Sequence, residues 1–252
     1  MTDSKLKALI LVAGIGRRMM PITQTTSKSL LKIGDKPLLW YSIYNLQNIG
    51  VNNFVFVVGH KAGMIRRFVQ EFFPDVRCEF VFNDQFSSKN SIYSFYVARN
   101  SIVKHNFFRL AGDLLYTREI AERLLTRKKH LISAVEHKIK ESPEEFSVRV
   151  NQNTKTIVEY GKHIQPEFSY GEAQGIDFVS KEASFSVYKS LEDIVKNNLT
   201  HEFPEYAFQN IINQNGTVYY QDNDATDFWC EVDTKEDLLF AKNNVHKISK
   251  QK

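Results

Sequence analysis

The sequence predicts an α/β protein with a doubly wound, mainly parallel sheet and a small antiparallel β extension. Up to about residue 136, apolar segments of strand length alternate with segments of helical period, at the spacing that right-handed βαβ crossovers need. The segment from Lys7 to Val12 is almost wholly apolar, which is typical of a central strand buried on both faces. Beyond Glu136 the apolar segments shorten and the alternation breaks down, which indicates the antiparallel part.

The elements of the parallel part follow in order along the chain. The first helix should begin at Pro37, whose fixed φ suits a first helical position, and end at Gly50. The strands are expected over residues 7–12, 53–58, 78–82, 107–111 and 130–135, and the further helices over residues 65–72, 90–100 and 118–125.

The second part mixes shorter strands with three helices. Strands are expected over residues 147–150, 156–158, 175–179 and 216–220, and helices over residues 181–196, 206–214 and 235–246. The polar stretch 138–145 is expected to be a mobile loop. No linker or internal repeat divides the chain, so we expect a single domain over residues 1–252.

Composition excludes several classes of protein. With 42% hydrophobic and 25% charged residues, the chain is neither disordered nor fibrous. No apolar run approaches the roughly 20 residues that a membrane helix needs, so we expect no membrane insertion and a cytoplasmic location. A net charge of +4 is too small to indicate nucleic acid as a partner. Cys78 and Cys230 are expected to be buried thiols. The oligomeric state stays open.

A glycine-rich turn follows the first strand. Gly14 and Gly16 let backbone N–H groups approach phosphates, and Arg18 and Lys28 supply positive charge, so the segment predicts a triphosphate site. The structural alternative is that the glycines only shape a tight turn. A dinucleotide fingerprint fits poorly, because Met19 stands where a small residue belongs and because residues 53–58 contain no ribose-binding acid.

Two aspartates follow other strand-like segments. Asp113 comes directly after Gly112, and Asp233 precedes the last expected helix. Phosphoryl transfer needs hard oxygen ligands for Mg²⁺, often one or two carboxylates, and these aspartates suit that role. The alternative for Asp233 is an N-terminal helix cap, with Glu236 three residues further on.

These motifs together resemble the sugar-1-phosphate nucleotidyltransferase-like superfamily, which has a Rossmann-like fold. The matching residues are Ala13, Gly14, Gly16, Arg18, Pro21, Thr23, Lys28, Leu30, Lys36 and Pro37, and Ser27 stands where the family usually has proline. The resemblance implies that Lys28 and Arg18 are catalytic and that Asp113 and Asp233 bind Mg²⁺. It also implies a nucleotide-binding core over about residues 1–135, an acceptor-binding part over about 136–230, and a metal segment with a C-terminal helix over 231–252.

Further segments resemble the CTP:phosphocholine cytidylyltransferase branch: residues 82–84, 89–94, 171–176 and 229–233. This resemblance implies CTP and a small phosphorylated acceptor, phosphocholine first, with 2-aminoethylphosphonate, inositol 1-phosphate or a sugar 1-phosphate as alternatives. The implied nucleotide-binding residues are Leu11, Ala13, Gly14, Gly16, Arg18, Lys28, Asn83, Asn90 and Ser94. The implied acceptor-binding residues are Tyr93, Glu172, Asp177, Trp229 and Glu231.

Structural alternatives accompany several of these residues. Asn90 suits a helix cap, Ser94 a solvated helix position, and Trp229 a core position. An alternative of another class is a non-catalytic, regulatory nucleotide-binding protein on the same fold. The combination of Lys28, Asp113 and Asp233 speaks against it, because binding alone does not require all three.

Overall fold

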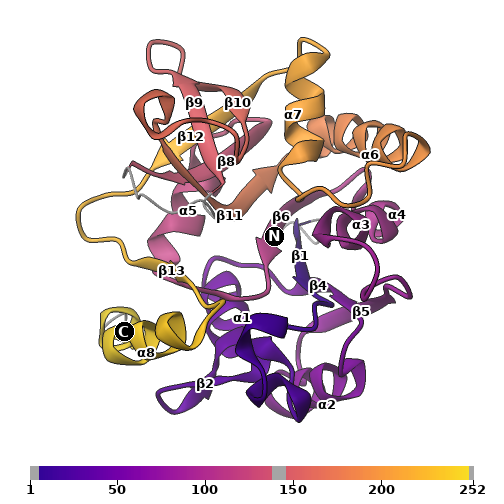
Figure 1. The fold of residues 1–252 in the computed structure, drawn as a ribbon, viewed down its shortest axis with the longest axis vertical. Helices are drawn as coiled ribbons and strands as arrows, with labels where there is room; N and C mark the ends of the chain where they lie inside the picture. The colour runs from indigo at the N-terminus through magenta and orange to yellow at the C-terminus, as the bar shows by residue number, and fades with distance from the viewer. Residues whose placement is uncertain (1–5, 138–145, 250–252) are drawn as a thin grey trace.

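The computed structural model describes residues 6–137 and 146–249, so the expected mobile loop at 138–145 lies outside the described residues. A nine-stranded sheet in the order β5-β4-β1-β6-β11-β8-β12-β10-β9 forms the centre of the molecule (Figure 1). Its strands are β1 (Leu6–Val12), β4 (Asn53–Val58), β5 (Arg77–Phe82), β6 (Asn106–Ala111), β8 (Leu131–Glu136), β9 (Ser147–Asn151), β10 (Thr156–Tyr160), β11 (Gly171–Val179) and β12 (Val218–Asp222).

The sheet confirms the predicted fold class. β1 pairs in parallel with β4 and with β6, and β4 pairs in parallel with β5, so the first strand is indeed central. β11 runs antiparallel to β6 and to β8, and β9 and β10 form the antiparallel end of the sheet. The carboxyl ends of β1, β5 and β6 therefore meet at one edge, where α/β proteins bind their ligands.

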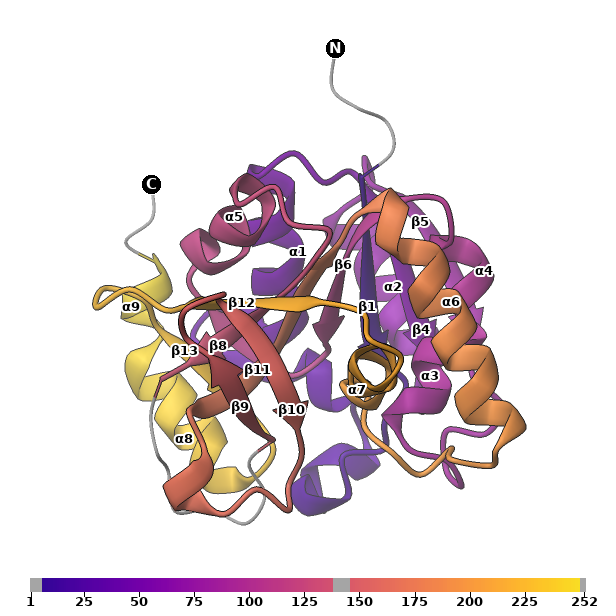
Figure 2. The same ribbon diagram turned by 90° about the horizontal axis from the view of Figure 1, so that it is seen from above.

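Helices cover both faces of this sheet. The apolar clusters place α1, α2 and α5 on one face and α3, α4, α6 and α7 on the other. Figure 2 shows α1 and α5 on one side of the strands and α3 and α6 on the other. Alternate residues of β1 serve the two clusters, since Ile10 packs in one and Leu9 in the other. The helices are α1 (Leu38–Asn48), α2 (Ala62–Phe72), α3 (Ser91–Val97), α4 (Arg99–Ile102), α5 (Arg118–Thr126), α6 (Lys181–Lys196), α7 (Tyr206–Asn213), α8 (Lys235–Asn244) and α9 (His246–Ser249).

Two short pairs of strands were not predicted from the sequence. β2 (Lys32–Ile33) pairs with β3 (Lys36–Pro37), and β13 (Trp229–Glu231) pairs with β7 (Leu114–Tyr116), both antiparallel. Strands of two or three residues are too short for a period to reveal them. The β13–β7 ladder holds the C-terminal segment directly beside the turn that carries Asp113. Single 3-10 turns occur at Arg17–Met19, Ile22–Gln24, Lys28–Leu30 and Pro166–Phe168.

Some boundaries and one burial prediction were wrong. β11 begins at Gly171 rather than residue 175, and the last expected helix is divided into α8 and α9. Cys230 is buried as expected, but Cys78 is exposed, because β5 is an edge strand whose first residues face solvent. Within residues 6–137 and 146–249, no helix has the length and apolar character to cross a bilayer.

Close approach of two strand ends explains Gly112. A Cβ atom at Gly112 would lie 2.4 Å from the carbonyl oxygen of Leu11, which is backbone and cannot move aside. Only glycine lets the end of β6 pass this close to β1. The position of Asp113, the next residue, depends on the same approach.

We therefore expect Gly112→Ala to lower the free energy of unfolding by roughly 1–3 kcal/mol, the usual cost of overpacking. Urea denaturation followed by circular dichroism measures this change. Gly63→Ala is the matched control, because nothing lies within 4 Å of a Cβ at Gly63 in α2. Alanine is the better helix former, so the control should be neutral or slightly stabilising. Equal stability of the two variants would contradict the close approach at Gly112.

Candidate active site

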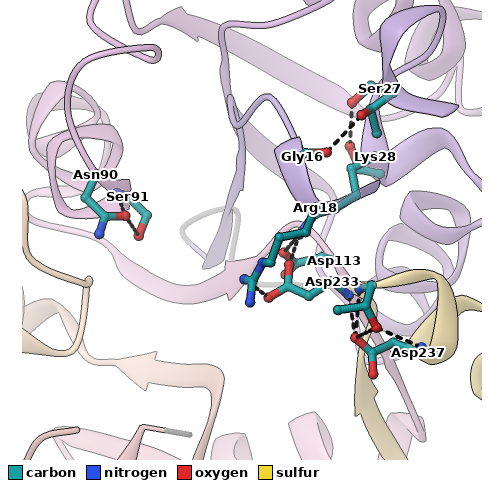
Figure 3. A network of polar contacts seen from close by, with 12 residues as sticks. Gly16, Arg18, Ser27, Lys28, Asn90, Ser91, Asp113, Asp233 and Asp237 are labelled. Carbon is teal, nitrogen blue, oxygen red and sulfur yellow. Dashed lines mark hydrogen bonds and ion pairs between the residues drawn. The ribbon is translucent and has the colours of Figure 1, made fainter. Parts of the chain in front are cut away.

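A cavity of about 1130 Å³ opens at the edge of the sheet where β1, β5 and β6 end. Most residues singled out from the sequence line it: Leu11, Ala13, Gly14, Gly16, Arg18, Lys28, Asn83, Asn90, Ser94, Asp113, Glu172, Trp229, Glu231 and Asp233. Of the predicted site residues, Tyr93 and Asp177 are not in the lining. Figure 3 shows Asn90 and Ser91 on one side and the cluster of Arg18, Asp113 and Asp233 on another.

The glycine-rich loop is shaped by its own contacts. Gly16 adopts the left-handed conformation, with φ +68°, just before a 3-10 turn. Its carbonyl oxygen accepts a hydrogen bond of 2.8 Å from the Thr23 hydroxyl. A Cβ at Gly16 would lie 3.1 Å from Cβ of Lys28, so the loop packs against the lysine that follows it. Ser27, which stands where the family usually has proline, is buried. Its hydroxyl oxygen lies 3.0 Å from that of Ser29, within hydrogen-bond distance.

Lys28 is the centre of the charged cluster. Its ammonium forms ion pairs with both Asp113 and Asp233, and Arg18 pairs with the other oxygen of Asp233 (Figure 3). The side chains of Lys28, Asp113 and Asp233 are only 15%, 16% and 19% exposed, so water screens these charges weakly. Burial alone would lower the pKa of Lys28, but the carboxylates of Asp113, Asp233 and Glu231 raise it above its ordinary value. The lysine therefore stays fully charged at neutral pH.

Glu231 joins the two aspartates. One oxygen from each of Asp113, Glu231 and Asp233 lies within 4.8 Å of the others. Part of the Glu231 residue is exposed in the cavity, yet withdrawal of its carboxyl group from bulk water raises its pKa well above the usual range, and repulsion by Asp113 and Asp233 adds to the shift. The family resemblance implied that Glu231 binds the acceptor. In the structure its carboxyl group lies beside those of Asp113 and Asp233 instead.

The donor set suits a hard divalent cation. Three carboxylates offer the oxygen ligands that Mg²⁺ prefers, and Oδ1 of Asp113 is buried with no hydrogen-bond partner among the described residues. The alternative role of Asp233 as a helix cap does not hold, because Thr234 caps α8 in a capping box with Asp237. Asp233 thus keeps its carboxylate for the cluster.

The side of the cavity near β5 carries polar groups suited to a nucleotide. The Asn83 amide donates a hydrogen bond of 3.0 Å to the hydroxyl of Ser94, and both residues are buried rather than solvated. Asn90 is the N-cap of α3, accepting 2.7 Å from the backbone N–H of Ser91, so its structural alternative is correct. It nevertheless lines the cavity.

The other side of the cavity is acidic and aromatic. Glu172 of β11 pairs in register with Glu136 of β8, and both line the cavity. The rings of Phe146 and Phe203, also in the lining, have centroids 5.5 Å apart. Sequence analysis missed Glu136, Phe146 and Phe203. The position of Glu136 at a strand end was an available signal, whereas nothing local marks the two phenylalanines.

Trp229 borders the cavity, whereas Asp177 and Tyr93 lie outside its lining. The Trp229 indole N–H donates 3.2 Å to the backbone oxygen of Gln174, and its ring packs in the apolar core while touching the cavity. Asp177 is instead buried in an ion pair with Arg109, which also lies 2.6 Å from Glu205. The ring of Tyr93 lies 5.6 Å from that of Tyr96, outside the lining.

The chain is similar to several nucleotidyltransferases along most or half of its length. The chain is 29% identical over 246 residues to the bifunctional IPC transferase and DIPP synthase of Aquifex aeolicus, covering 96% of this chain and 52% of that protein. It is 31% identical over 122 residues to choline-phosphate cytidylyltransferase of Streptococcus pneumoniae, covering 48% of this chain and 51% of the relative. These matches thus span about half of each relative's length. It is 24% identical over 255 residues to CTP:phosphoglutamine cytidylyltransferase of Campylobacter jejuni, covering 92% and 98% of the two chains.

Solved structures show the same fold. The inositol-1-phosphate CTP transferase of T. maritima superposes with a TM-score of 0.82 at 22% identity, covering 100% of this chain and 99% of the other. The CTP:phosphocholine cytidylyltransferase of Streptococcus pneumoniae gives 0.76 at 18% identity, with 96% and 99% covered. The family model described as "Nucleotidyl transferase" matches residues 7–248. The chain belongs to the nucleotidyl transferase family.

Proposed function

We propose that this chain is a magnesium-dependent cytidylyltransferase, which transfers CMP from CTP to a small phosphorylated alcohol, most specifically phosphocholine, and releases pyrophosphate. The observation that carries the proposal is the Lys28 ammonium held by Asp113 and Asp233 below the glycine-rich loop. Nucleotide binding alone needs cations near phosphates. Carboxylates gathered around the same lysine add a site for a metal at the phosphoryl group that is transferred.

In the proposed reaction, a phosphate oxygen of the acceptor attacks the α-phosphorus of CTP. The new P–O bond forms as the bond to the oxygen bridging the α- and β-phosphates breaks, and that oxygen leaves with its electron pair as part of pyrophosphate. The attacking phosphate is already an anion, so no side chain has to remove a proton. The side chains therefore act through position and charge.

Each group in the cluster has an assigned task. The backbone N–H groups of Gly14 and Gly16, with Arg18, hold the β- and γ-phosphates. Lys28 is assigned to the α-phosphate, where negative charge builds during transfer. Asp113 and Asp233, with Glu231 beside them, would hold Mg²⁺, which when bound neutralises phosphate charge.

The acceptor is assigned to the acidic and aromatic side of the cavity. A quaternary ammonium has no N–H group, so aromatic faces, worth about 0.5–2 kcal/mol each, and carboxylates must bind it. Trp229, Phe146, Phe203 and Glu172 offer both kinds of group. The similarity to choline-phosphate cytidylyltransferase supports phosphocholine as the acceptor.

We expect Asp113→Asn and Asp233→Asn to fold normally and to lower kcat by roughly 100-fold or more, because each removes charge from the proposed metal site. Pyrophosphate release at saturating Mg²⁺ measures the loss. Asp193→Asn, on the exposed face of α6, is the matched control and should be unaffected. Near-normal kcat in either site variant would remove that aspartate from the metal site.

Lys28→Ala should lower kcat more than it raises the KM for CTP, because the ammonium matters most as charge develops on the α-phosphate. Steady-state kinetics with varied CTP separate the two effects. Lys32→Ala, at an exposed position nearby, is the control. A variant with full kcat and weakened CTP binding alone would reduce Lys28 to a ground-state contact.

The proposed substrates are tested with four nucleoside triphosphates against phosphocholine, phosphoethanolamine, 2-aminoethylphosphonate, inositol 1-phosphate and glucose 1-phosphate. We expect CTP with phosphocholine to give the highest kcat/KM. Trp229→Leu should reduce the preference for phosphocholine, since it removes an aromatic face, whereas Trp40→Leu, outside the cavity lining, should not. A preference for inositol or a sugar phosphate would overturn the proposed acceptor.

A further inference from the structure

The side-chain amide of Gln174 is buried in the wall of the cavity, with no hydrogen-bond partner among the residues that the structure describes. It is only 1% exposed, and neither Nε2 nor Oε1 has a hydrogen-bond partner among the described residues. It also lines the cavity. Proteins pair nearly all buried polar groups, because an unpaired amide loses its bonds to water without replacement. A buried amide of this kind beside a cavity suits a ligand that completes its hydrogen bonds.

The backbone places Gln174 next to the charged cluster. In the antiparallel pair β11–β6, Ile176 lies opposite Leu110, so Gln174 comes beside the turn that leads into Asp113. The register of β11 against β8 is interrupted between Ala173 and Asp177, where Gly175 has a φ of +70°. Such irregularities redirect side chains and are frequent beside active sites. The Trp229 indole fixes the backbone of Gln174 by donating 3.2 Å to its oxygen.

The order of strands separates Gln174 from the nucleotide side. The glycine-rich loop follows β1 and Asn83 follows β5, whereas β11 lies beyond β6 on the other side of β1. Glu172, two residues away on β11, belongs to the acidic side assigned to the acceptor. Gln174 thus lies between the charged cluster and the acceptor's end of the cavity.

We propose that Gln174 is an acceptor-binding residue whose amide N–H group donates a hydrogen bond to the phosphate of the acceptor. This inference rests on the proposed function, in which that phosphate must approach the α-phosphorus near Asp113. A quaternary ammonium offers the amide no hydrogen bond, so the phosphate is the part of phosphocholine that pairs with Gln174. The Gln174 amide can donate to the phosphate without adding charge to a part of the cavity where Glu172 and Glu231 already contribute carboxyl groups.

The test compares Gln174→Met and Gln174→Leu with the wild type, using CTP and phosphocholine as the probes. Each replacement keeps a side chain of similar size and removes the amide. We expect the KM for phosphocholine to rise roughly tenfold or more, as for loss of a hydrogen bond to a charged group, with the KM for CTP within about twofold. Gln214→Leu, at an exposed position after α7, is the control.

The melting temperature is a second readout, because a binding role and a structural role of Gln174 predict opposite changes in it. Removing two unpaired polar atoms from a buried place should leave the melting temperature of the free enzyme unchanged or raise it. An amide that served the fold would instead lower it when replaced. Lost acceptor affinity together with retained stability is the result expected of a binding residue.

The role of Gln174 and the proposed function can fail separately. An increase in the KM for CTP in place of that for phosphocholine, or a lower melting temperature in both variants, would overturn the role of Gln174. Use of another acceptor by the wild type would overturn phosphocholine, and Gln174 is then judged on the KM of that acceptor. If the wild type uses no acceptor, the proposed function fails, and the acceptor-binding role of Gln174 fails with it.

Discussion

The balance of charge around the Lys28 ammonium is the constraint on which the site depends. Three segments far apart in the chain meet there: the loop before Lys28, the turn at Asp113, and the segment that ends at Asp233. Without the lysine, the carboxylates would repel one another in a place that water screens poorly. Without the carboxylates, burial would lower the pKa of the Lys28 ammonium. Each partner therefore makes the burial of the other tolerable, and a cation or a phosphate can replace one of them.

The rest of the architecture serves this meeting point. Parallel pairing of β1 with β6 brings the glycine-rich loop and Asp113 to the same edge, and Gly112 allows the closest approach. The β13–β7 ladder adds the third segment. The capping box of Thr234 and Asp237 starts α8 without using Asp233. Helix capping and charge pairing are thus divided between neighbouring residues.

Sequence predicts those parts of the molecule that have a local signature. The buried strands, the glycine-rich turn and the aspartates after strand ends are of this kind. They predicted the fold class, and most of the site residues predicted from them line the cavity. Asp177 was expected to bind the acceptor, but it pairs with Arg109 on the neighbouring strand, a partner 68 positions away that no local pattern indicates. Phe146 and Phe203 were not predicted to line the site for the same reason, since only tertiary contact brings their rings together.

β13 follows every strand of the central sheet along the chain, so the ribosome synthesises it after them. All nine strands of the central sheet have been synthesised by Asp222, whereas Glu231 and Asp233 follow later. A nascent chain can therefore complete its sheet and its glycine-rich loop before the carboxylate cluster exists. The carboxylate cluster is therefore the last part of the site to be synthesised, after every strand of the sheet that supports it.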